Sequence, residues 1–136
     1  MFLLGFPLLL IPIAIYNIMA FIIPGVPWDS KLLTIAMMSG AEWTITLSDG
    51  LIVLALILLF FEMIKATRHT RRSVLDHLLS TVVFIGALVE FLLVKQAGTS
   101  LFAILIVICL VDVIGGYSVS IRSASRDYTI ERADAA

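Results

Sequence analysis

Four apolar segments, separated by short polar stretches, account for most of this chain. They cover residues 2–23, 47–65, 74–95 and 101–121. A helix needs about 20 mostly apolar residues to cross a bilayer, and each segment is close to that length. The pattern therefore predicts an all-α fold, a polytopic bundle of four transmembrane helices that forms a single domain over residues 1–136.

The first of these segments contains Pro7 and Pro12. We expect its helix to bend there, because each proline frees a carbonyl group that a neighbouring helix must satisfy. The segment lacks the basic start and the small-residue cleavage pattern of a signal peptide. It is therefore interpreted as a retained span.

Residues 24–46 are predicted to form an outer loop. Within it, residues 31–40 are apolar but too short to span, which indicates a helix along the membrane interface or a cap on the bundle. The sequence leaves open whether this stretch is interfacial or re-entrant. Trp28 and Trp43 flank it as the residues of an interfacial aromatic belt would.

Polar residues predict where the later helices begin and turn. Ser48 or Asp49 is available to cap the second helix, and Ser73 followed by Asp76 resembles a capping box for the third. Gly98 is well placed at a helix C-terminus, in a turn short enough to force an antiparallel helix hairpin. The last two helices should therefore lie side by side.

Composition and charge agree with a membrane location. Hydrophobic residues make up 61% of the chain, charged residues 14%, and the mean hydropathy is +1.12, which is unusual for a soluble domain. By the positive-inside rule, both termini, the turn at 66–73 and the tail at 122–136 should be cytoplasmic. The outer side has two basic residues, Lys31 and Lys95. The cytoplasmic side has seven, which are Lys65, Arg68, Arg71, Arg72, Arg122, Arg126 and Arg132.

The basic cluster Lys65, Arg68, Arg71 and Arg72 is explained by topology alone. It could also hold anionic lipid headgroups, each nearby cation contributing about 1 kcal/mol. Membrane lipids are therefore expected partners. For the tail, disorder and a short helical extension or docking peptide remain equally open.

Three acidic residues fall inside the predicted spans, where an ionisable group costs roughly 2.5 to 3.5 kcal/mol. At about 1.5 Å per residue from the cytoplasmic ends, Asp112 lies near ~15 Å, Glu90 near ~21 Å and Glu62 near ~5 Å. Glu62 is expected to form an interfacial salt bridge, since Lys65 is close in sequence. Each acid is a candidate intramembrane polar site.

Glu90 shares its estimated depth with Asn17 of the first span. A hydrogen bond between Asn17 and a neutral Glu90 would satisfy two groups that hydrocarbon penalises; a proton or ion relay is the alternative. Asp112 has no basic residue predicted at its level. It could pack against small surfaces at Gly86, Gly115 or Gly116, contact a partner subunit, or handle protons.

Motifs for soluble chemistry are lacking. The sequence has no phosphate-binding glycine loop, no nucleophile elbow and no dinucleotide fingerprint. His69 and His77 have no further metal-binding residues near them in sequence. An enzyme, a cofactor, a metal site and a nucleic-acid partner are therefore not expected.

Three stretches carry a resemblance to known proteins. They are Asp76-His77-Leu78-Leu79-Ser80, Glu90-Phe91-Leu92-Leu93-Val94, and Asp112-Val113 ahead of Arg126-Asp127. Together they resemble a group of small bacterial inner-membrane proteins with four spans, over the last two-thirds of the chain. The resemblance implies fold and an inner-membrane location only. Small multidrug exporters share the size and the number of spans, but their essential acid lies in the first helix; the first helix here has Asn17 and no acid, which counts against them.

Two functions follow as hypotheses. The first is an accessory, assembly or scaffolding subunit that binds another integral membrane protein, or itself, with Asp112 and Glu90 fixing helix register. The second is a small oligomeric channel or proton-coupled transporter in which these acids line the path.

Overall fold

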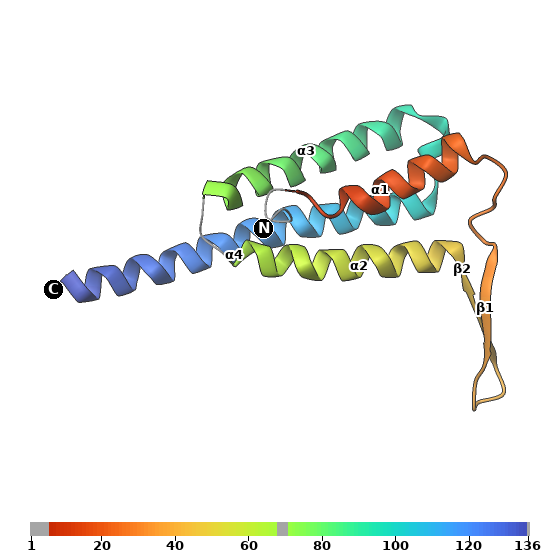
Figure 1. Ribbon diagram of the computed structural model, residues 1–136, viewed down its shortest axis with the longest axis horizontal. Helices are drawn as coiled ribbons and strands as arrows, with labels where there is room; N and C mark the ends of the chain where they lie inside the picture. Colours follow the sequence, from red (N-terminus) through yellow and green to blue (C-terminus); the bar gives the residue numbers. More distant parts are fainter. Residues whose placement is uncertain (1–5, 68–70, 136) are drawn as a thin grey trace.

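The computed structural model describes residues 6–67 and 71–135 and is mostly helical (Figure 1). Three helices contain a stretch long and apolar enough to cross a membrane. They are α2 (Leu47–Ala66), α3 (Arg71–Leu93) and α4 (Ser100–Ala135). The fourth, α1 (Leu10–Asn17), is shorter. Four apolar helices are found over the described residues, as predicted, and three of these have the length of a span.

Helix α4 forms the centre of the bundle. It packs along both α2 and α3, while α2 and α3 make few contacts with each other, and α1 also lies against α4. The buried apolar core is accordingly richest in α4 residues. It includes Leu101, Phe102, Leu105, Ile106, Ile108 and Cys109.

The helix of the predicted first span, residues 2–23, begins later than expected: residues 2–5 lie outside the described residues, and residues 6–9 are not helical. Helix α1 begins at Leu10 and continues as a π-helical segment, Ile18–Ile22, which gives a rod of about 20 Å against a hydrocarbon core of about 30 Å. Pro12 explains the late start, because proline lacks an N–H and is tolerated in the first helical turn. Before the helix, Leu10 N donates to the carbonyl of Pro7 at 3.0 Å.

Helix α2 matches the second predicted apolar segment to within one residue, but its cap is different. Thr46 caps α2: its hydroxyl accepts from Asp49 N at 3.3 Å, and the Asp49 carboxylate accepts from Thr46 N at 3.0 Å. This is a reciprocal capping box in which Asp49 is the third helical residue. Ser48, the other predicted cap, is already inside the helix.

Helices α3 and α4 form the predicted antiparallel hairpin through a 3₁₀ turn, Lys95–Ala97 (Figure 1). The capping box at Ser73 and Asp76 is wrong, since α3 already includes Arg71. For the tail, the helical alternative is found: α4 continues to Ala135 and projects beyond the bundle (Figure 1).

Residues 31–40 do not form the expected interfacial helix. Strands β1 (Lys31–Ala36) and β2 (Glu42–Thr46) pair in antiparallel fashion. At the tip, Gly40 N donates to the carbonyl of Met37 at 3.0 Å, and Gly40 has a φ of +88°, a value that glycine adopts without steric cost. Met37 N also donates to the carbonyl of Ala41 at 2.8 Å, which leaves a three-residue loop, 38–40, with its glycine in the left-handed region. The fold is therefore not purely α-helical.

The bundle has two distinct ends (Figure 1). At the hairpin end lie the hairpin, the start of α2, the turn between α3 and α4, and the end of the π-helical segment. At the opposite end lie the last turn of α2, the first turn of α3 and the C-terminal extension of α4. Lys65 lies at this second end, which we call the Lys65 end.

Two glycines predicted to permit close helix packing behave differently. A Cβ on Gly116 would lie 3.2 Å from His77 Nδ1 and 4.0 Å from the Cβ of Ala66, whereas a Cβ on Gly86 would meet nothing within 4 Å. Gly116 therefore sits where α4 approaches α2 and α3. The prediction for Gly86 is wrong, because its position in α3 faces open space.

Substituting these two glycines should have opposite effects. Gly116→Leu must displace the His77 ring or push α4 away from α3, and should destabilise the fold by about 1 to 3 kcal/mol, the usual cost of overpacking. Gly86→Ala should stabilise it by up to about 1 kcal/mol, because alanine is the better helix former. Detergent unfolding followed by circular dichroism measures both; equal effects would contradict the packing at Gly116.

Candidate functional site

A buried polar cluster lies at the Lys65 end, centred on the ammonium group of Lys65. Lys65 Nζ donates to the carbonyl of Phe6 at 2.7 Å, to Glu62 Oε1 at 3.1 Å and to Asp76 Oδ1 at 3.2 Å. An ammonium group has three N–H donors, so these three acceptors use all of them. Lys65 thereby ties together the N-terminal segment, α2 and α3.

Glu62 completes the connection to the N-terminal segment. Its Oε1 accepts a hydrogen bond from Leu8 N at 2.6 Å, and the residue is only 4% exposed. Residues 6–9 precede α1; the carbonyls of Pro7 and Leu8 accept from the first helical N–H groups, but Leu8 N and the carbonyl of Phe6 bond to α2 side chains instead. Non-helical backbone at membrane depth must find partners in the protein. Glu62 and Lys65 supply a matching acceptor and donor.

Asp112 lies deeper in the same region, on α4. It is 5% exposed, and the hydroxyl of Ser80 on α3 donates a hydrogen bond to its carboxyl group. Asp112 also interacts electrostatically with Glu62, Asp76 and Lys65. The contact with Ser80 joins α3 to α4, whereas the ion pairs of Lys65 are with Glu62 and Asp76.

The charges of this cluster do not balance. Glu62, Asp76 and Asp112 provide three carboxyl groups; among the described side chains, the Lys65 ammonium group bonds to Glu62 and Asp76, and His77 interacts electrostatically with Asp76. Isolated charges are expensive in a low-dielectric interior. We therefore expect the cluster to retain at least one proton.

The predicted pairing of Asn17 with Glu90 is confirmed. Asn17 Nδ2 donates to Glu90 Oε2 at 3.3 Å, which joins the end of α1 to α3. The amide oxygen of Asn17 is buried and has no hydrogen-bond partner. The pair thus holds two helices at a fixed register.

Tyr16 forms a second node, nearer the hairpin end. Its ring is fully buried and stacks on Trp28 with ring centroids 5.0 Å apart. It also contacts the ring of Phe102, with ring centroids 4.8 Å apart. Its hydroxyl donates to the carbonyl of Gln96 at 2.8 Å and lies 2.8 Å from Thr99 Oγ1. Tyr16 therefore joins α1 to the turn between α3 and α4.

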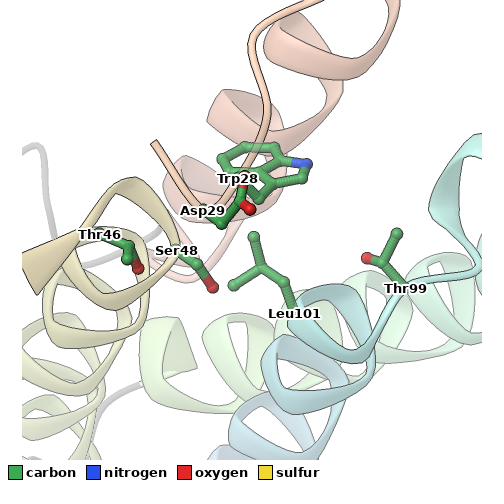
Figure 2. Close-up of a pocket in the computed structure, with 6 residues that line it drawn as sticks. All are labelled: Trp28, Asp29, Thr46, Ser48, Thr99 and Leu101. Carbon is green, nitrogen blue, oxygen red and sulfur yellow. The ribbon is translucent and has the colours of Figure 1, made fainter. Parts of the chain in front are cut away.

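An open cavity of about 380 Å³ lies at the hairpin end, between the first turns of α2 and α4 (Figure 2). Thr46 and Thr99 in its lining already serve as helix caps, since Thr99 Oγ1 accepts from Phe102 N at 3.2 Å. The hydroxyl oxygens of Thr46 and Thr99 therefore already accept hydrogen bonds from the backbone of the protein. The cavity is lined by Trp28, Asp29, Thr46, Ser48, Thr99 and Leu101.

The structure brings together some predicted residues and adds others. Glu62 and Lys65 form the expected ion pair, but Asp76, expected as a helix cap, is the second carboxylate on Lys65. The sequence offered a signal for this contact. A short turn between two antiparallel helices places the end of one beside the start of the next, which puts Lys65 and Asp76 at one depth.

Part of the predicted basic cluster falls outside the described residues. Arg68 belongs to residues 68–70, and the side chains of Arg71 and Arg72 are also not described. The proposed lipid-headgroup contact of these arginines stays a prediction. Lys65, the remaining member, is committed to the buried cluster and has a side chain only 10% exposed.

These contacts limit the chemistry that the polar cluster can carry out. The site can hold helices in register and can hold protons. The described residues include no group of three or more His, Cys, Asp or Glu arranged to bind a metal ion.

Comparisons with protein-family models, with curated proteins and with solved structures found no match to this chain.

Proposed function

We propose that this chain is an integral membrane protein that serves as an accessory, assembly or scaffolding subunit of a membrane complex. In this proposal the Lys65 end and both termini face the cytoplasm, as the distribution of basic residues favours. The resemblance noted in the sequence favours the bacterial inner membrane. Partner helices would bind the apolar outer faces of α2 and α3.

One observation carries the proposal: the intramembrane polar side chains bond to other helices of the same chain. Asn17 joins α1 to α3 through Glu90, and Ser80 joins α3 to α4 through Asp112. Polar contacts of this kind between membrane helices contribute roughly 0.6 to 1.7 kcal/mol each. They suit a rigid element with fixed register better than a polar pathway.

The outer surfaces of the bundle support the same proposal. Large apolar side chains remain exposed along α2 and α3, so these helices can face lipid or the helices of another protein. Those on α2 are Val53, Leu56, Ile57, Phe60, Phe61 and Ile64.

The test uses two substitutions at Asp112. Asp112→Asn keeps a group that can bond to Ser80 and should leave assembly intact, whereas Asp112→Leu removes it and should weaken assembly by roughly 1 to 2 kcal/mol. Native mass spectrometry after mild extraction from the source membrane measures co-purifying chains. Stoichiometric recovery of another membrane protein with wild type and Asp112→Asn supports the proposal; recovery of this chain alone contradicts it.

A second candidate is a small oligomeric channel or proton-coupled transporter that uses Asp112 and Glu90. The excess of buried carboxyl groups around Lys65 favours it, because a retained proton is the requirement for proton coupling. In this case Asp112→Asn and Asp112→Leu would both abolish proton flux into liposomes while assembly persisted. Flux that survives Asp112→Asn would exclude this candidate.

A further inference from the structure

The hairpin formed by β1 and β2 is the one described element that extends sideways from the bundle. It lies across the hairpin end and continues past α2 (Figure 1). Its base is fixed there, since Thr46 is both the last residue of β2 and the cap of α2. In addition, Leu32 lies 3.5 Å from the position of a Cβ on Gly50.

The two faces of this hairpin differ in chemistry. Directly opposed residues share a face, so the pairs Leu33 with Ile45 and Ile35 with Trp43 form one apolar face. Thr34 and Thr44 lie on the other, with their hydroxyls 3.3 Å apart. On the apolar face, Leu33 is 55% and Trp43 53% exposed.

A hairpin of this kind needs a surface to rest on. Two strands without a covering layer are marginally stable in water, and every residue of β1 is exposed. The hydrocarbon core cannot serve, because the outer edges of β1 and β2 carry unpaired backbone groups that lipid tails cannot satisfy. The boundary between the lipid headgroups and the hydrocarbon core meets both requirements, because it covers the apolar face and leaves polar partners for the unpaired backbone groups.

We propose that the apolar face of the hairpin is a membrane-interface anchor that lies in the lipid headgroup region. The position of the hairpin favours lipid as its occupant. Its base lies next to the first residue of α2, and its strands run crosswise to the helices (Figure 1). In a membrane the strands would therefore follow the bilayer surface. Its apolar side chains continue the lipid-facing belt of α2, and tryptophan is the residue that favours this depth. The inference rests on the proposed membrane location.

The two tryptophans of the chain allow a direct test in phosphatidylcholine vesicles. Trp28→Phe keeps an aromatic ring against Tyr16 and leaves Trp43 as the sole tryptophan, while Trp43→Phe leaves Trp28 as the matched control. Emission is quenched from the lipid side by phosphatidylcholine brominated close to the headgroup and from the water side by iodide. We expect a blue-shifted Trp43 that brominated lipid quenches and iodide does not.

A pair of charged variants locates the contact on one face. In the Trp28→Phe background, Ile35→Asp places a charge beside Trp43 on the apolar face and should shift its emission to the red and restore iodide quenching. Thr34→Asp places the same charge on the opposite face and should leave both readouts unchanged. Equal effects of the two variants would contradict the proposed face.

The remaining outcomes separate this inference from the proposed function. If the vesicles float with the protein but Trp43 is quenched by iodide alone, the anchor is wrong and the face is open to an aqueous partner. If Trp43 is shielded from both quenchers and the shielding is lost on dilution in lipid, a second copy covers it, and the anchor is again wrong. Failure of the protein to float overturns the membrane proposal itself.

Discussion

Replacing Lys65 by glutamine is expected to lower the free energy of unfolding by about 3 to 5 kcal/mol, the usual cost of removing one partner from a buried ion pair. The change leaves Glu62 and Asp76 without their shared counter-charge and the carbonyl of Phe6 without its donor. Titration with sodium dodecyl sulfate in dodecyl maltoside micelles, followed by circular dichroism, measures the loss.

A control and a compensating variant make this result specific. Lys95→Gln removes an exposed cation beyond the end of α3 and should change stability by less than about 0.5 kcal/mol. Adding Glu62→Gln and Asp76→Asn to Lys65→Gln removes the uncompensated charges and should recover part of the loss. Wild-type stability of Lys65→Gln alone would mean that the cluster contributes nothing net.

Truncating Tyr16 to alanine should cost about 3 to 5 kcal/mol, the range found for aromatic side chains removed from packed cores. The ring is fully buried, stacks on Trp28 and contacts Phe102. Its loss therefore opens a cavity where α1 meets α4 and removes the contact that positions residue 28. The same detergent titration measures the effect.

The hydroxyl group of Tyr16 can be tested separately from its ring. Tyr16→Phe keeps the packing but leaves the carbonyl of Gln96 without this donor, which should cost about 1 kcal/mol. Phe60→Ala removes an aromatic ring that is 62% exposed on α2 and should have a much smaller effect than Tyr16→Ala. Equal losses at Tyr16 and Phe60 would argue against a packed core at this position.

The pairing of Asn17 with Glu90 could be predicted from sequence, whereas that of Lys65 with Asp76 was missed, and the difference has a physical cause. Depth in a membrane helix follows from about 1.5 Å per residue, so two polar residues at equal depth were expected to meet. The sequence around Asp76 also fits a capping box, a local pattern that competes with a tertiary contact. Only the packed structure decides between the two.

The hairpin illustrates a different limit. An apolar run such as 31–40 does not distinguish a helix from a strand by periodicity alone. Its strand conformation depends on pairing with residues 42–46 and on the positive φ of Gly40 at the tip. The partner strand was hidden within what was predicted to be an outer loop.

The sequence by itself determined that the chain is helical and apolar, where α2 begins and ends, and that α3 and α4 form an antiparallel hairpin. These features follow from hydrophobic length and turn residues, which act locally along the chain. Only the tertiary structure decided that α4 is central, that helix α1 begins at Leu10, and that Lys65 gathers Glu62, Asp76 and the backbone of Phe6. These depend on contacts between residues distant in sequence, which hydrophobicity, being non-directional, does not specify.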